Sequence, residues 1–216
     1  MTFLEITNEV LRRLRENTVS TVNQTAYSRL IGYYINDTKR QVEDAWNWIA
    51  LSTSTPVVTS AGTTTYTVTG SGIRQKDVTV NITTSGNQAS LTQVSPTWIQ
   101  NQRQLTTVQS SRPCYFAWVG TDGTDGTVEL FPTPDGTYTL MFNMTVPQVN
   151  LSVDADVLTV PTEPVIAGAV ARALVERGED GGLSSGEAYN VFKNVLSDYI
   201  SVEMSRDASY DSWVVV

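Results

Sequence analysis

The sequence predicts a mixed α+β protein in which helices from both chain ends form one body and hold an inserted β module. Helical spacing of apolar residues occurs at both ends, whereas the middle is rich in Thr, Ser and Val and alternates with a period of two. Neither end is long enough to build a core easily alone, so the two ends are expected to pack together. The predicted parts are a helical body at 1–51 and 161–208, an antiparallel sandwich or barrel at 52–160, and an extended tail at 209–216.

Two helices are expected before the β module. The first begins after Thr2, because Glu5 lies three residues further on and this capping-box spacing satisfies two backbone donors. The second shows the clearest helical period of the chain and is expected to end near Trp48. Its apolar face comprises Tyr27, Leu30, Ile31, Tyr34, Ile35, Thr38, Val42, Ala45, Trp46 and Ile49.

The middle is predicted to form antiparallel strands and one short helix. Four segments are expected to pair as two hairpins, residues 56–59 with 65–68 and residues 77–83 with 89–94. Ser95 as a cap and Pro96 at the first helical position indicate the short helix. Three more strands, separated by Asp-Gly turns, are expected at 113–119, 127–131 and 137–146.

Two more helices are expected after the β module, so that four principal helices form a bundle. The third follows Pro161, has Thr162 as its cap and ends at Gly178. The fourth begins with Ser184, which forms a second capping box with Glu187.

The residue inventory excludes several classes of active site. There is no histidine and a single cysteine, Cys114, so no Ser-His-Asp, Cys-His or histidine-bearing zinc site can form. The net charge of −8 argues against a nucleic-acid reader, because phosphate contacts require clustered Lys and Arg. No signal peptide or membrane-spanning run is recognisable, so the chain is expected in the cytoplasm until it assembles, without a membrane contact.

Paired carboxylates are the remaining candidates for catalysis, since glycoside cleavage needs only two acids beside the bond. The candidate pairs are Glu43 with Asp44, Asp122 with Asp125, and Asp154 with Asp156. The last two could also bind calcium, but neither has a full set of oxygen ligands, and Asp is favoured in turns for its own backbone hydrogen bonds. No catalytic, cofactor-binding or metal-binding residue is therefore predicted.

One basic cluster, formed by Arg12, Arg13 and Arg15, has two interpretations. It could be a solvated helix face whose charges pair with glutamates of the same helix. It could also be a docking patch for an acidic partner.

The last residues of the chain lose the helical period and end on apolar side chains. The candidate partner-binding residues of this tail are Tyr210, Trp213, Val214, Val215 and Val216. They could be buried in their own subunit, or they could dock on a neighbouring subunit or another protein, with the tail added as a strand.

Several segments resemble head-to-tail adaptors of tailed phages, particularly the tubular or accessory adaptor of short-tailed phages. The most specific runs from Leu130 to Leu140, where a strand, the turn Pro-Thr-Pro-Asp and a second strand follow one another. Residues 111–116 and 62–68 resemble two further strand segments of that family, although Val-Thr-Gly stands where the family hairpin often ends in Leu-Pro. The return through Val160-Pro161 into an alanine-rich helix is similar as well, so the resemblance covers almost the whole chain in order.

That resemblance implies a structural virion protein that forms a dodecameric ring, joins the portal to the tail, closes the packaged head and continues the DNA channel. Its implied partners are the portal protein, a downstream nozzle or tail-tube protein and further copies of itself. Double-stranded DNA would pass through without specific binding, which the acidic balance favours because tight binding would slow its exit. The implied location is the head-to-tail junction of the virion, after synthesis in the host cytoplasm. Neither enzymatic activity nor a cofactor is expected.

Two other functions stay open from the sequence. The Thr-rich middle is compatible with a receptor- or glycan-binding tail component, which would predict trimers and a long β stalk. The acidic pairs are compatible with a cell-wall glycan hydrolase.

Overall fold

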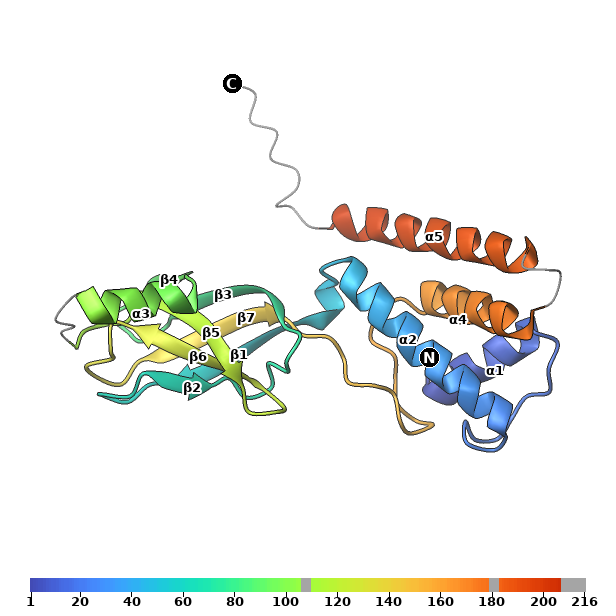
Figure 1. Cartoon of the computed structure of the whole chain (residues 1–216), viewed down its shortest axis with the longest axis horizontal. Helices are drawn as coiled ribbons and strands as arrows, with labels where there is room; N and C mark the ends of the chain where they lie inside the picture. Colours follow the sequence, from blue (N-terminus) through green and yellow to red (C-terminus); the bar gives the residue numbers. More distant parts are fainter. Residues whose placement is uncertain (106–109, 179–182, 207–216) are drawn as a thin grey trace, which may run out of the picture. The chain divides into compact units, whose positions relative to one another are not determined.

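The structure is a computed structural model that describes residues 1–105, 110–178 and 183–206. It is a mixed α+β fold, as predicted, and its described residues form five α-helices and one seven-stranded sheet (Figure 1). The chain divides into two compact units, one of Met1–Leu51 with Gln148–Val216 and one of Ser52–Pro147. Among the described helices, none has both the length and the apolar character needed to cross a membrane.

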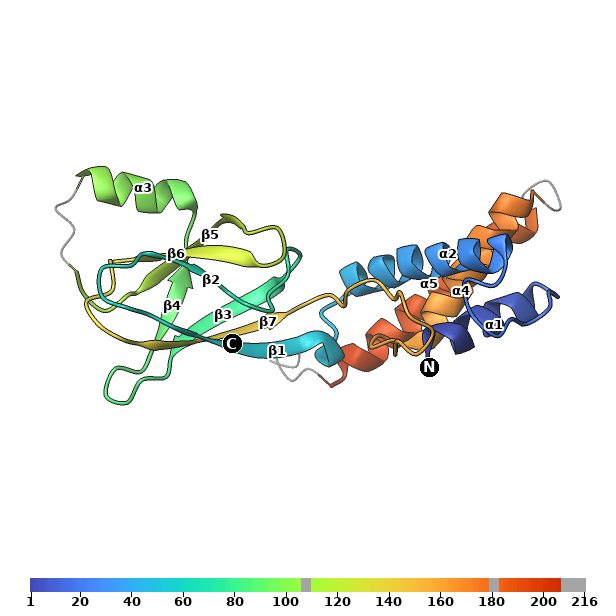
Figure 2. The same ribbon diagram turned by 90° about the horizontal axis from the view of Figure 1, so that it is seen from below.

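The helical unit is built from segments at both ends of the chain. Its elements are α1 (Phe3–Arg13), α2 (Ala26–Ala45), the 3-10 turn η1 (Ile49–Leu51), α4 (Thr162–Arg177) and α5 (Leu183–Met204). α4 contacts each of the other three α-helices, α1 also contacts α2, and α5 packs chiefly against α4 (Figures 1 and 2). α4 therefore lies at the centre of this unit.

Caps define where the first two helices begin. The capping box of Thr2 and Glu5 is present, as predicted. α2 begins with a second capping box, between Thr25 and Ser28, which the sequence pattern did not indicate because Ser replaces the usual Glu or Gln. α2 ends at Ala45, before the predicted Trp48, because the backbone becomes extended at Trp46. Trp48 instead folds back into the core, where its indole N–H donates to the carbonyl of Val42 over 2.7 Å.

The later helices begin close to the predicted positions. α4 starts at Thr162 itself, with Pro161 in the cap position, and Gly178 ends it in the left-handed conformation, as predicted. α5 begins at Leu183, one residue before the predicted cap Ser184.

Small residues on α4 let its neighbours approach closely. Ala169 and Ala173 are fully buried, and at Gly168 an added Cβ would clash with Thr38 Cγ2 and lie 3.0 Å from the ring of Phe192. Because Thr38 belongs to α2 and Phe192 to α5, Gly168 marks the point where three helices meet.

The segment that returns from the β unit packs with the helices. Residues 148–160 were expected in the β module, but the structure assigns them to the helical unit. The side-chain amide of Asn36 donates to the carbonyl of Leu151 over 3.0 Å and accepts from its N–H over 2.8 Å. Asp154 likewise accepts from the N–H of Val22 over 3.0 Å. Asn36 and Asp154 thus each satisfy backbone groups of the other segment, which would otherwise be buried unpaired.

A buried ion pair holds the start of this segment. Lys39 Nζ lies 2.9 Å from Glu43 Oε1, and both side chains are almost completely buried. Lys39 also donates to the carbonyl of Gln148 over 2.6 Å, and Glu43 accepts from its N–H over 3.1 Å. Burying charges is unfavourable unless they are paired and hydrogen-bonded, and here both conditions are met.

The β unit is one nearly closed sheet with the strand order β1-β7-β3-β4-β5-β6-β2. Its elements are β1 (Ser52–Val58), β2 (Thr65–Thr67), β3 (Lys76–Ile82), β4 (Ala89–Gln93), α3 (Pro96–Leu105), β5 (Tyr115–Thr121), β6 (Gly126–Phe131) and β7 (Thr139–Thr145). Neighbouring strands are antiparallel except β4 and β5. Fully buried side chains at its centre include Val80, Phe116, Val128, Leu130 and Phe142.

One of the two predicted hairpins is wrong. β3 and β4 pair as expected, with Val80 opposite Leu91. β1 and β2, however, pair with β7 and β6 and not with each other. The chain between β1 and β2 also hydrogen-bonds to later residues, since the N–H of Thr59 donates to the carbonyl of Tyr138 and that of Gly62 to the carbonyl of Pro134. The predicted start of α3 is confirmed, since Ser95 Oγ accepts from the N–H of Trp98.

Candidate docking groove

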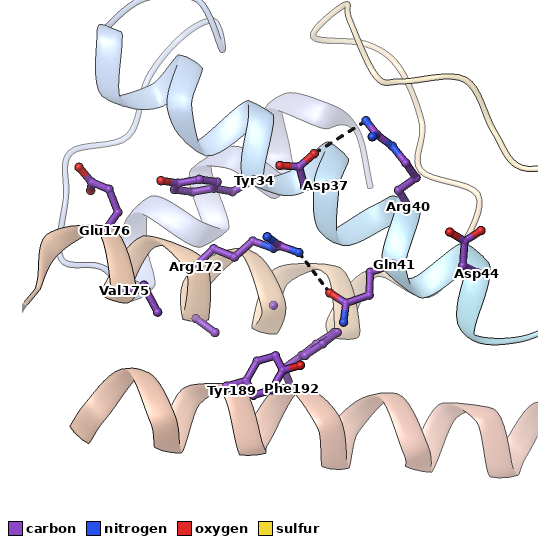
Figure 3. Close-up of a pocket in the computed structure, with 12 residues that line it drawn as sticks. Tyr34, Asp37, Arg40, Gln41, Asp44, Arg172, Val175, Glu176, Tyr189 and Phe192 are labelled. Atoms are coloured by element: carbon purple, nitrogen blue, oxygen red, sulfur yellow. Dashed lines mark hydrogen bonds and ion pairs between the residues drawn. The ribbon is translucent and has the colours of Figure 1, made fainter. Parts of the chain in front are cut away.

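A groove of about 930 Å³ lies between α2, α4 and α5, wholly within the helical unit. Figure 3 shows its lining, with α4 in the middle, side chains of α2 above it and those of α5 below it. It is lined by Tyr34, Asp37, Arg40, Gln41, Asp44, Gly168, Ala171, Arg172, Val175, Glu176, Tyr189 and Phe192. A groove of this size between helices has the dimensions of a binding site.

The floor of the groove is apolar. Gly168, Ala171 and Val175 follow one face of α4 at helical spacing, and Phe192 closes the α5 side. Val175 is 64% exposed although it is an aliphatic residue next to buried Ala171. The small side chains keep the space open, because larger ones would fill it. The result is apolar surface that faces solvent between two helices.

Charged groups of both signs border this floor. Arg172 donates to Gln41 Oε1 over 3.2 Å, which links α4 to α2 across the groove (Figure 3). Arg40 forms a long ion pair with Asp37, at 3.8 Å, and both side chains are about half exposed. Such a pair contributes little to stability, so Arg40 can change partner at small cost.

Tyr34 adds a neutral polar group to the α2 side. Its pKa is raised above the ordinary value, first because burial disfavours the phenolate and second because Glu176 is nearby. At neutral pH the phenol therefore keeps its proton and can donate a hydrogen bond. An apolar floor with such polar edges suits an amphipathic helix better than a small polar ligand.

The predicted arginine cluster lies on the exposed end of α1. Arg12 and Arg13 both pair with Glu9, and Arg13 also lies 3.1 Å from Glu163. Arg15 follows the helix with a left-handed φ of 59° and forms no ion pair with another described residue. Two of the three arginines thus have the pairing expected of a solvated face, while Arg15 remains available to a partner.

The predicted tail residues lie outside the described residues. They are Tyr210, Trp213, Val214, Val215 and Val216. The described chain before them ends beside a second hollow of about 610 Å³, whose lining includes Ile49, Tyr199, Val202 and Arg206.

The acidic pairs in the turns bind the backbone. Asp122 accepts from the N–H groups of Asp125 and Thr124, which lower its pKa. Asp125 accepts from Gly70 and Gly72 over 3.0 and 2.9 Å, and so holds a neighbouring turn.

Asp156 has the same role as the turn acids. It accepts from the N–H groups of Val153 and Ser152, which lower its pKa. Glu43 of the first pair is in the buried contact with Lys39. A general acid needs a raised pKa, which is the opposite of what Asp122 and Asp156 have. No group of three or more Cys, Asp or Glu side chains suited to a metal ion occurs within the described residues.

The comparisons with known proteins agree with the resemblance found in the sequence. A family model described as SU10 adaptor protein matches residues 1–215, which takes in both units. No match was found among curated proteins. The match supports a phage head-to-tail adaptor but not the narrower assignment to short-tailed phages. The chain therefore belongs to the SU10 adaptor protein family.

Proposed function

We propose that this chain forms a ring that joins the portal of a phage head to the tail, closes the packaged head and continues the DNA channel. The observation that carries the proposal is the match of the adaptor family to residues 1–215, so that the helical unit and the β unit are both part of it. The proposed partners are the portal, a downstream nozzle or tail-tube protein, and other copies of the chain in a dodecameric ring. The proposed site of action is the virion, after synthesis in the host cytoplasm.

The groove on the helical unit supports a role in assembly. Apolar surface that faces solvent is unfavourable for an isolated subunit and favourable once a partner covers it. The groove has a volume of about 930 Å³ and lies between helices, as do the sites that receive a partner helix. The net charge of −8 supports a channel that DNA crosses without being held.

The proposal includes the absence of enzymatic activity. The best-placed turn carboxylates, Asp122 and Asp156, are occupied by backbone N–H groups and have lowered pKa values, which argues against a carboxylate-pair hydrolase. In a cell-wall release assay, the purified chain is expected to release no more glycan than buffer. Release that disappears in Asp122→Asn or Asp156→Asn would contradict this part of the proposal.

Electron microscopy of the purified chain mixed with purified portal tests the main proposal. We expect a ring of added density on one face of the portal, with portal alone as the control. In dilute solution the free chain should be monomeric by light scattering, because docking supplies the template for the ring. A stable trimer of the free chain that does not change when portal is added would favour a tail-fibre protein instead.

A further inference from the structure

α5 carries a second apolar surface besides the one that packs on α4. Val191, Val195, Tyr199 and Val202 follow one another at steps of four, four and three residues. This set is called the α5 stripe below. Val191, Tyr199 and Val202 are 55%, 37% and 52% exposed, and Val195 is half-buried. Residues at these steps lie on one flank of a helix, so the stripe is continuous.

The start of the α5 stripe lies on the flank of α5 opposite the groove, whereas Tyr199 lies only roughly 20° from Phe192 on the helical wheel. Successive helical residues are rotated by roughly 100°, so Val191 points roughly 200° away from Tyr189. Tyr189 lines the groove, and Phe192, which is buried against α4, lies between the two flanks. One subunit therefore presents an apolar groove on one side of α5 and exposed Val191 on the other, while Tyr199 and Val202 of the stripe also line the hollow beside Ile49.

We propose that the α5 stripe of one copy docks into the groove of a second copy. The inference rests on the proposed function, since it names the contact through which subunits of the ring would meet. Two different surfaces that fit each other give a head-to-tail contact, and repetition of such a contact closes a ring when the rotation allows it. A contact of like surfaces would stop at a dimer.

The two surfaces agree in length. From Val191 to Val202 the stripe covers eleven helical steps, or roughly 16 Å at about 1.5 Å per residue. The α2 wall of the groove, from Tyr34 to Asp44, covers ten steps, or roughly 15 Å. Three turns of an incoming helix can therefore lie over Val175 along the whole groove.

Both surfaces carry acids, since the groove is bordered by Asp37, Asp44 and Glu176 as well as by Arg40 and Arg172, so an acidic partner surface must meet the arginines. Glu187 and Asp198 are exposed and lie next to the α5 stripe on the helical wheel, at roughly 100° per residue. The groove offers Arg40, which forms a long ion pair with Asp37 at 3.8 Å. Asp198 of the incoming helix is thus the acidic group that we pair with Arg40 of the receiving copy. When Asp198 replaces Asp37 as the partner of Arg40, Arg40 stays paired and the exposed Asp37 stays solvated.

Disulfide trapping of the full chain tests this contact. In a Cys114→Ser background, Val175→Cys is placed in the groove and Val195→Cys in the α5 stripe, and the protein is oxidised at high concentration. A bond forms only when the two Cα atoms come within about 7 Å. The chain with both new cysteines should give a ladder of dimers, trimers and larger species. An equimolar mixture of the two single variants should give heterodimers and nothing larger.

A matched control uses Ser197→Cys, which is exposed on α5 but away from the stripe. Combined with Val175→Cys, it should give at least about tenfold less cross-linked product. Homodimers of Val195→Cys alone that form as readily as the heterodimer would indicate a contact of like surfaces and overturn the proposal. Absence of any ladder would overturn it as well. Preferential trapping of Val175→Cys with Trp213→Cys would assign the groove to the chain's own tail, and the proposal would again be wrong.

Charge reversal tests the orientation within the contact. Arg40→Asp and Asp198→Arg should each reduce the trapping rate several-fold at low salt, and the two changes together should restore most of it. If the double reversal is slower than either single one, the proposed pairing of Asp198 with Arg40 is wrong.

Portal attachment is measured separately on the same variants. Attachment of a complete ring without any Val175–Val195 trapping rejects this contact and leaves the proposed function standing. Formation of the ladder by a chain that never attaches to the portal would support this contact and reject the proposed function.

Discussion

Gly168 shows how a single missing side chain sets the distances between three helices. We expect Gly168→Ala to lower the free energy of unfolding by about 1–3 kcal/mol, because the added methyl group meets Thr38 and Phe192 and the helices must shift. Gly186 is the matched control, since it lies on α5 with open space around it. Gly186→Ala should be neutral or stabilising by up to about 1 kcal/mol, from helix propensity alone. Urea unfolding of both variants measures the difference, and equal effects would contradict the proposed close packing.

Asp156 makes stability depend on pH in a defined direction. Its pKa is lowered from 3.8 by hydrogen bonds from the backbone of Val153 and Ser152, so the folded state favours the carboxylate. The stabilisation is present above 3.8 and is lost as the pH falls through the lowered pKa of the folded state. Asp156→Asn should therefore unfold at a lower temperature than wild type near neutral pH, and this difference should shrink under acid conditions. A difference in Tm that stays constant from neutral to acid pH would be inconsistent with this role.

At the level of single residues, the sequence predicted what local chemistry determines. The cap of α1 at Thr2 and the left-handed end of α4 at Gly178 are set by neighbours in the chain, and both were found. The second helix was expected to end near Trp48, because its helical period continues through Trp46 to Ile49. The indole of Trp48 instead binds the carbonyl of Val42 after the helix has ended, a tertiary contact that periodicity does not encode.

At the level of elements, alternation identified the strands but not their partners. β1 is seven residues long and pairs along its whole length with β7, whereas β2 has three residues and pairs with β6. A period of two shows which residues share a face of a strand, but it does not show which strand lies beside them. The groove was missed for a similar reason. The spacing of Gly168, Ala171 and Val175 was visible on one helix, but a groove needs the positions of two others.

The end of α1 is the element on which the predicted basic cluster can be tested. Changing Arg12, Arg13 and Arg15 together to Glu should slow association with the portal several-fold at low salt and change it little at high salt, because exposed charges act mainly on the association rate. Arg12 and Arg13 already pair with Glu9, so Arg15→Glu alone is expected to account for much of the effect.

Surface plasmon resonance over a salt series measures these association rates. Replacement of all three arginines with Gln is the control, since it removes charge without reversing it and should give a smaller effect. An association rate and salt slope that match wild type in every variant would leave the cluster as a solvated helix face.

At the scale of the whole molecule, the order of elements along the chain was predictable and the assignment of the return segment was not. Helices at both ends and strands between them follow from periodicity. Residues 148–160 lack a helical period and were grouped with the strands before them. Their backbone is held by side chains of the helical unit, among them Asn36 and Lys39, and no pattern within 148–160 could reveal those partners.

The last prediction concerns residues 213–216, which lie outside the described residues. Full burial of Trp213 and one or two valines at a partner would contribute roughly 3–6 kcal/mol before the entropy of ordering, which is enough to decide attachment. The helical unit has a core among its described residues, in which Ile6, Ile31 and Ile166 are fully buried. Deletion of 213–216 should therefore leave the Tm of the free chain nearly unchanged and abolish or strongly weaken attachment to the portal.

Differential scanning calorimetry and a pull-down with purified portal measure the two effects of this deletion separately. Trp213→Ala in the full-length chain is the matched control, because it keeps the valines and should weaken attachment less than the deletion. A deletion that unfolds the free chain would show that the tail belongs to the core, since a segment that only docks on a partner cannot stabilise a subunit that has no partner.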